Sequence, residues 1–338
     1  MEGMRAISMT WVILGHNFSF GSGQLMVKNK AFVFDVMNGH SNGLAIEAIK
    51  SGQFSVDTFF FIGSTLVSFL LLKDLDKTKG WGNMEGFIHM ILFYVNRILR
   101  ITIPYALVIL FFIGIPPLIF KDSLGAGSQA IMEAEKCKEY AWAHLTYSHL
   151  FNPGDMDSTV NNCLGHTWFL SADMIFFVLS PLLIYPLWIA SKSNKTLVKI
   201  LAYSWWFFWV LASLVVTFAV VYESAGSQAN QRPNRVEKYM VDHHLGPFNF
   251  SPFGYRNQCY LVGIMTGYLL HLYRNTEVKI DSRVNLVVWQ VVAVVSASLV
   301  YGPFWIECLQ CSKYVLYYGL HKELISYIKI KKKLNLMI

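Results

Sequence analysis

The sequence predicts an all-α fold, a polytopic bundle of transmembrane helices with about seven spans. Of the 338 residues, 54% are apolar and only 14% are charged, whereas about a quarter of the residues in soluble domains carry a charge. The apolar residues gather in long runs, and the Lys and Arg residues lie mainly in the short connections between them. Orientation in a membrane therefore accounts for the net charge of +7, and nucleic-acid binding is not expected.

The spans follow from runs that approach the roughly 20 apolar residues needed to cross a bilayer. They are predicted at residues 6–20, 54–72, 101–120, 164–190, 200–221, 257–273 and 284–301. Residues 87–95 are expected to form an apolar or interfacial segment, and three prolines predict a kink in the third span. The stretch 121–162 is predicted to be a long polar connection.

The charges of the short connections predict the orientation of the spans. The basic connections at 73–100, 192–199 and 274–283 alternate with the others, which places them and the N-terminus in the cytosol. The connection at 121–162 is then outside or lumenal. Because it contains Cys137 and ends beside Cys163, a disulfide could form there if that side is oxidising.

The first span carries two ionisable residues in register. Arg5 and His16 are eleven residues apart, about three helical turns, so they lie on nearly the same helix face. If the stretch crosses a bilayer, Arg5 lies near one surface and His16 lies well inside, where an ionisable group marks a candidate functional site. The alternative is a histidine at the outer end of a helix that simply bonds to a neighbour or to water.

Other charged residues lie in or beside later spans. Asp173 lies deep in an apolar run, and Asp57 lies near the start of the second span, where it is either interfacial or paired. Arg97 and Arg100, three residues apart, share a helix face before the third span. Asp173 could instead be a packing group bonded to a Ser or Trp. The arginines could instead mark topology, since basic residues at a cytosolic helix end need no ligand.

Five segments carry a resemblance to a known family. They are Gly-Met-Arg to Leu-Gly-His at 3–16, Asp-Thr-Phe-Phe-Phe at 57–61, Arg-Ile-Leu-Arg-Ile-Thr-Ile-Pro-Tyr at 97–105, Gly-His-Thr-Trp-Phe-Leu-Ser-Ala-Asp-Met at 165–174 and Tyr-Leu-Val-Gly-Ile-Met-Thr-Gly-Tyr-Leu at 260–269. In order and spacing they resemble the acyltransferase-3 family of membrane proteins, in particular its invertebrate nose-resistant-to-fluoxetine branch. The resemblance implies a core of roughly ten helices. An acyltransferase-3-like domain is therefore expected at 1–320, incomplete at its C-terminal end, followed by a basic atypical tail at 321–338.

The resemblance also implies a function. The protein would be an integral-membrane O-acyltransferase, transferring groups other than amino-acyl groups from acyl-CoA, a co-substrate, to a hydroxyl of a lipid, a sugar or another acceptor. Such a reaction needs a base for the hydroxyl proton, a bound donor and stabilisation of the oxyanion. His16 is expected to be the general base. Arg97, Arg100 and Arg5 are expected to hold the phosphates of CoA.

A second set of residues is expected to support this chemistry by orienting the histidine or lining the acceptor side. They are Asp173, as a further catalytic candidate, Asp57 and Trp168. No permanently bound cofactor is expected. No metal site is predicted, because the cysteines lack zinc-type spacing and the paired His243 and His244 lack a third ligand.

Two other functions stay open. A carrier of lipids or small molecules would also use intramembrane His, Asp and Arg residues, although no inverted repeat with paired broken helices is evident. An inactive, truncated paralogue would show no turnover. In each case membrane lipids are the expected partners, and the chain is expected to be a multi-pass protein of an endomembrane or the plasma membrane.

Overall fold

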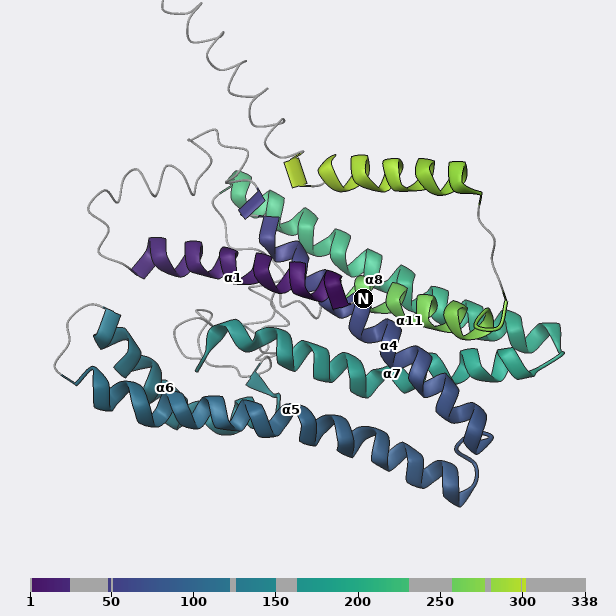
Figure 1. Cartoon of the computed structure of the whole chain (residues 1–338), viewed down its shortest axis with the longest axis horizontal. Coiled ribbons are helices and arrows are strands. Elements are labelled where there is room, and N and C mark those ends of the chain that lie inside the picture. Colours follow the sequence, from purple (N-terminus) through teal and green to yellow (C-terminus); the bar gives the residue numbers. More distant parts are fainter. Residues whose placement is uncertain are drawn as a thin grey trace, which may run out of the picture. The chain divides into compact units, whose positions relative to one another are not determined.

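The computed structural model describes residues 2–24, 48–49, 51–121, 126–149, 163–230, 257–276, 281–298 and 300–301. Its regular elements are all helices (Figure 1), as predicted. Within the described residues, four helices are long and apolar enough to cross a membrane: α4 (Phe54–Thr78), α5 (Met84–Ile119), α7 (Trp168–Lys192) and, within α8 (Thr196–Asn230), the stretch Thr196–Phe218. The paired histidines at 243 and 244 and the tail at 321–338 lie outside the described residues.

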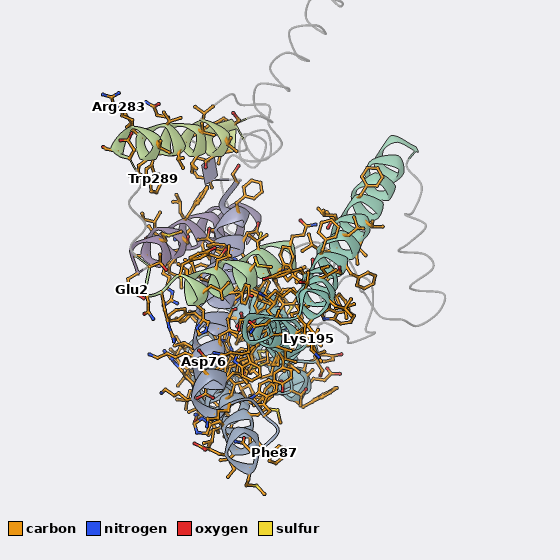
Figure 2. The ribbon with its side chains drawn as sticks, turned by 90° about the vertical axis from the view of Figure 1, so that its right-hand side faces the viewer. Glu2, Asp76, Phe87, Lys195, Arg283 and Trp289 are labelled. Carbon is orange, nitrogen blue, oxygen red and sulfur yellow. A yellow bond between two sulfur atoms is a disulfide. The ribbon has the colours of Figure 1, made fainter. Side chains whose placement is uncertain are left out.

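The chain divides into two compact units. The first comprises Met1–Thr10 and Phe54–Thr276, and the second comprises Trp11–Gln53 and Glu277–Ile338. Helix α1 (Glu2–Gln24) is therefore shared, with its first turns in the first unit and the rest in the second. The second unit also contains a shorter apolar helix, Ser282–Ser298, whose Trp289 is largely exposed (Figure 2).

Close packing between α4 and α11 (Asn257–Leu272) forms the centre of the first unit. Gly263 and Gly267 let the two backbones approach, since a Cβ atom at Gly267 would lie 2.7 Å from the Cβ atom of Ser68. The Ser68 hydroxyl donates a hydrogen bond to the Ile264 carbonyl at 2.9 Å. Small residues at helix contacts are the usual means of close packing in membranes, where lipid removes the hydrophobic drive for association.

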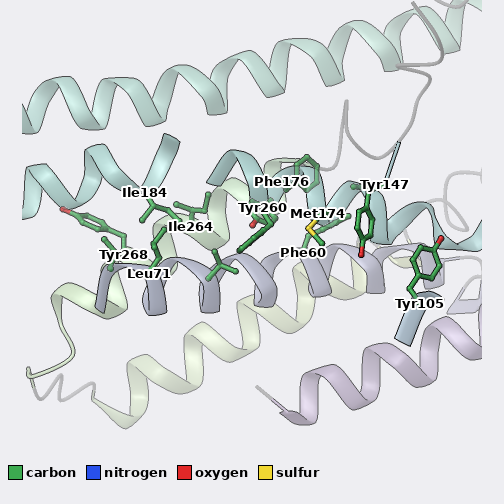
Figure 3. Packing of buried hydrophobic residues seen from close by; sticks show 14 of the residues in the cluster. Phe60, Leu71, Tyr105, Tyr147, Met174, Phe176, Ile184, Tyr260, Ile264 and Tyr268 are labelled. Atoms are coloured by element: carbon green, nitrogen blue, oxygen red, sulfur yellow. The ribbon is translucent and has the colours of Figure 1, made fainter. Parts of the chain in front are cut away.

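An apolar core surrounds this contact and extends to α7. Figure 3 shows Leu71 of α4 and Ile264 and Tyr268 of α11 close to Ile184 of α7, and all four side chains are almost completely buried. Toward the other end of α4, the rings of Phe60 and Phe176 meet edge to face, with centroids 5.3 Å apart. The helices α4, α7 and α11 thus pack against one another, and α4 and α7 also line the candidate site.

Helix α5 corrects the prediction for residues 87–120. The expected interfacial segment and third span form one continuous helix, capped at its start by the Asn83 side chain, which accepts a hydrogen bond from the Gly86 amide. Its three prolines lie inside the helix. Arg97 and Arg100 therefore lie in the interior of a long helix rather than at a helix end, as the sequence had suggested. Within this helix, Arg97 forms an ion pair with Asp173 of α7.

The stretch predicted as a long polar connection contains a further helix, α6 (Ala126–Leu145), which packs along α5 (Figure 1). The disulfide considered from the sequence is present. It joins Cys137 of α6 to Cys163, with a distance of 4.5 Å between the two Cα atoms. Beside it, the Leu164 amide donates a hydrogen bond to the Glu133 carboxylate at 2.5 Å. These contacts hold α6 against the start of α7.

Replacing Cys137 by Ser should lower the free energy of unfolding by about 3 kcal/mol, because the disulfide closes a loop with a sequence separation of 26 residues. The temperature midpoint of unfolding in detergent, measured with and without reductant, tests this. The wild type should lose stability in reductant, whereas the Cys137→Ser variant should be insensitive to it. Equal stability of both proteins under oxidising conditions would contradict the prediction.

Candidate functional site

A cavity of about 750 Å³ lies in the first unit between facing stripes of α4, α5 and α7. On each helix the lining residues recur every three or four positions, which is the spacing of a single helix face. They are Phe59, Gly63, Leu66, Val67, Leu70, Leu71 and Asp74 from α4, His89, Leu92, Phe93, Asn96, Arg97, Arg100 and Ile101 from α5, and Phe169, Asp173 and Phe177 from α7. Arg5 of α1 completes the lining. The cavity is therefore apolar along its length with a few charged side chains.

An ion pair joins Arg97 and Asp173 across this cavity. Nη2 of Arg97 lies 2.5 Å from Oδ2 of Asp173, and the side chains are 23% and 11% exposed. The guanidinium carbon also lies 4.4 Å from the ring centroid of Phe177, a cation–π contact. Within the described residues, Nε of Arg97 is buried without a hydrogen-bond partner. Two residues that the sequence suggested separately thus act as a pair.

The other two arginines of the cavity are more accessible. Arg100 is exposed and forms no ion pair with any residue in the described ranges. Arg5 donates a hydrogen bond to Glu2 at 3.0 Å, near the surface. With Arg97 neutralised by Asp173, Arg100 is the cation best placed to receive an anionic ligand.

The cavity also holds a histidine–carboxylate pair that the sequence did not suggest. Nδ1 of His89 lies 2.9 Å from Oδ1 of Asp74, and the side chains are 38% and 31% exposed. The two residues are fifteen positions apart on different helices, and the turn between α4 and α5 brings them together. No sequence motif marks such a pair, since it depends on the geometry of that turn.

The remaining predicted residues lie elsewhere. Asp57 lines a smaller cavity of about 360 Å³ in the first unit, together with Gln258 and Cys259. Trp168 begins α7, where its ring meets that of Phe169 edge to face. His16 belongs to the second unit, where its Nδ1 lies 3.0 Å from the Val12 carbonyl. Of the seven candidates, the structure brings together Arg5, Arg97, Arg100 and Asp173.

A second polar cluster lies beside the disulfide and was not predicted. The rings of His144 and His149 stack with centroids 4.0 Å apart, and both residues are buried. The Tyr105 hydroxyl lies 2.6 Å from Nδ1 of His144, and the Ser171 hydroxyl lies 3.0 Å from Nδ1 of His149. Burial lowers the pKa of His144 to about 4, helped by the charge of His166. Burial, followed by the charge of His144, lowers the pKa of His149 to about 3.

These shifts predict that the protein loses stability in acid. Both histidines are neutral in the folded protein, whereas in the unfolded chain they bind protons below about pH 6.5. The unfolded state therefore takes up more protons as the pH falls from about 6.5 toward 4, and each histidine lowers the free energy of unfolding by up to about 1.4 kcal/mol per pH unit. Unfolding midpoints in detergent between about pH 8 and 4.5 measure the effect. His144→Asn should roughly halve the slope, and a wild-type midpoint unchanged from pH 7 to 5 would refute the prediction.

Comparisons with known proteins agree on one family. The acyltransferase domain of the acyltransferase-3 family matches residues 1–321. Nose resistant to fluoxetine protein 6 of Caenorhabditis elegans is 25% identical over 326 residues, covering 90% of this chain and 36% of that protein. The chain thus spans little more than a third of the length of that relative. No solved structure matches the chain.

Proposed function

Because the chain belongs to the acyltransferase-3 family, we propose that it transfers an acyl group from acyl-CoA to a hydroxyl acceptor within a membrane. The observation that carries the proposal is the arginine-containing cavity inside the helical bundle. Guanidinium groups bind phosphate oxygens through paired hydrogen bonds, and CoA presents several phosphates. The apolar side chains of the same cavity are suited to a pantetheine arm and an acyl chain.

In this proposal the three arginines have different tasks. Arg100 contacts the phosphates directly, because it forms no ion pair with any described residue, and Arg5 joins it from the surface, where it also pairs with Glu2. Arg97 is held in place by Asp173 and offers its remaining donors. Asp173 is thus a positioning residue, which refines the role expected for it from the sequence.

His16 is the proposed general base for the acceptor hydroxyl, because an imidazole nitrogen can accept a proton from a hydroxyl within hydrogen-bond reach. The hydroxyl gives its proton to the base, its oxygen attacks the thioester carbonyl, the new carbon–oxygen bond forms, the carbon–sulfur bond breaks, and CoA leaves as its thiolate. Asp57 and Trp168 are proposed to line the acceptor side. The basic connections are proposed to face the cytosol, where acyl-CoA is made available.

Membranes that contain the full chain test the proposal through retention of radiolabelled acyl-CoA. Arg100→Ala should weaken retention about tenfold or more, as expected for the loss of a charge-assisted hydrogen bond. Arg283→Ala, which removes an exposed arginine in the second unit, is the matched control and should change nothing. Equal retention by wild type and Arg100→Ala would contradict the assignment of the cavity.

A transfer assay separates catalysis from transport. Label from the acyl group should appear covalently in lipid or another hydroxyl product, and His16→Ala should abolish this while leaving retention of acyl-CoA intact. Transfer that survives His16→Ala would remove His16 as the base. Uptake of labelled compound into vesicles without covalent product would favour the carrier.

A further inference from the structure

The pair of Asp74 and His89 lies at one end of the cavity in the first unit, away from Arg97. Resting on the function proposed above, we infer that Asp74, held in place by His89, accepts a hydrogen bond from the 6-amino group of the adenine base of CoA. The cavity then recognises the nucleotide of the donor as well as its phosphates. Asp74 determines specificity, and His89 is a positioning residue.

The hydrogen bonding of the pair favours a ligand that donates. Nδ1 of His89 donates to Oδ1 of Asp74 at 2.9 Å, since an ionised carboxylate can only accept. Among the described residues, the other carboxylate oxygen, Oδ2, has no hydrogen-bond partner. Both side chains line the cavity and are about a third exposed, so a bound molecule can reach this oxygen. A carboxylate oxygen that is fixed in direction and free to accept suits an N–H group of a ligand.

The charge of the pair argues against a phosphate at this end of the cavity. The pair is neutral overall when the imidazole of His89 is protonated, and it is negative when the imidazole is neutral. In neither state does it attract a phosphate, whereas Arg100 does. An uncharged group with N–H donors meets no such repulsion, and the 6-amino group of adenine is a group of this kind.

The spacing along α5 fits the adenosine half of CoA. The helical rise places His89 about 12 Å from Arg97 and about 16 Å from Arg100 along the helix axis. This is of the order of the separation between the pyrophosphate and the far edge of the adenine base in an extended molecule. Between the two ends, Leu92 and Phe93 line the cavity and provide apolar surface for the faces of the base.

The direction of the cavity agrees with the order of the groups along the donor. Asp74 and His89 flank the basic connection between α4 and α5, which is proposed to face the cytosol. The opposite end of the cavity is lined by Phe59 and Phe169, whose ring centroids are 6.0 Å apart. An acyl-CoA molecule that enters from the cytosol with its acyl group first leaves its nucleotide nearest to the entrance, beside Asp74.

A purely mechanical role for the pair is less satisfactory, because a neighbouring carboxylate already ties the helices. Oδ1 of Asp76 lies 2.8 Å from Nζ of Lys192 and 3.0 Å from Nε1 of Trp188. Its Oδ2 lies 3.1 Å from Nε2 of His271. Asp76 thereby joins α4 to α7 and α11 with both oxygens, outside the lining of the cavity. Asp74, two residues earlier, instead faces the cavity and keeps one oxygen free.

The test compares the retention of CoA and of its analogue with purine in place of adenine, which lacks only the 6-amino group, by membranes containing the full chain. Wild type should retain CoA about tenfold more tightly, because the analogue leaves Oδ2 of Asp74 without a donor. Asp74→Leu should reduce this ratio to within about twofold. Glu85→Leu, which removes an exposed carboxylate one turn before His89 and outside the cavity lining, is the matched control and should preserve the ratio.

Two further measurements separate positioning from chemistry. His89→Leu should lower the ratio, whereas His89→Gln should keep most of it, because the glutamine amide can still donate to Oδ1 of Asp74. In the transfer assay, Asp74→Leu should raise KM for acyl-CoA about tenfold with little change in kcat, since the base lies far from the reacting carbonyl and contributes equally to binding of the substrate and of the transition state.

The outcomes are separable. Equal retention of CoA and the purine analogue by wild type overturns the inference, needs no variant, and leaves the proposed function intact. A tenfold ratio that survives Asp74→Leu also overturns it, because another group would then bind the amine. If Asp74→Leu instead removes a preference for CoA over dephospho-CoA, the pair binds the 3′-phosphate and the inference is wrong. No retention of any of these compounds removes the proposed function and, with it, this inference.

Discussion

Replacing Asp173 by Asn should lower the free energy of unfolding by about 3 to 5 kcal/mol, because it leaves the charge of Arg97 inside the helical bundle without a partner. Arg97 is only 23% exposed, and its guanidinium lies over the ring of Phe177 in an apolar wall. The temperature midpoint of unfolding in detergent measures this loss. Retention of acyl-CoA should fall as well, since Arg97 would no longer be held in place.

A double replacement separates stability from function. Arg97→Met combined with Asp173→Leu removes both charges and keeps apolar volume, so it should recover most of the lost stability, as buried ion pairs replaced by apolar residues often do. It should not recover retention of acyl-CoA, because the guanidinium is gone. A double variant as unstable as Asp173→Asn would show that the loss comes from packing rather than from the uncompensated charge.

Replacing Gly267 by Leu should prevent α11 from docking on α4 and leave little folded protein. Even a single Cβ atom there would lie 2.7 Å from the Cβ atom of Ser68, and the backbone carbonyl of Thr65 is still closer. Backbone on the facing helix cannot move aside as a flexible side chain could, so overpacking at this position is expected to exceed the usual penalty of about 1 to 3 kcal/mol. The yield of monodisperse protein in detergent and its unfolding midpoint provide the readout.

Gly114 of α5 provides the matched control for the smaller replacement Gly267→Ala. A Cβ atom at Gly114 would meet nothing within 4 Å, so Gly114→Ala should fold as well as wild type. A Gly267→Leu protein with a wild-type unfolding midpoint would mean that the two helices are not packed as closely as described. Gly267→Ala should give an intermediate loss.

Hydropathy was sufficient to predict most of the helices. The apolar runs around 54–72 and 164–190 form α4 and α7, because a largely apolar stretch has few ways to satisfy its backbone in lipid other than as a helix. Hydropathy did not predict that α5 is one continuous helix, because Arg97 interrupts the apolar run. A charge interrupts a hydropathy pattern whether or not a partner neutralises it, and the partner, Asp173, lies 76 residues away.

The candidate site was predictable only in part. Ionisable residues in apolar runs are costly and rare, and for this reason the sequence alone indicated Arg97, Arg100 and Asp173. The sequence did not indicate His89 and Asp74, because they lie in or beside a stretch rich in charged residues that resembles an ordinary connection between helices. His144 was missed for a similar reason: α6 is too polar to register as part of the bundle, and only the fold buries that side chain against Tyr105.

The length of α5 has a consequence for the surrounding lipid. Its 36 residues extend to about 54 Å, well beyond the roughly 30 Å of hydrocarbon in a bilayer. The helix must therefore tilt steeply or raise its ends through the headgroup layers. Arg100, near the middle of this helix and without an ion pair among the described residues, is then expected to draw water and headgroups inward. The membrane should be locally thin beside the cavity. A thicker bilayer would make this thinning, and therefore the hydration of the charged side chains, more costly.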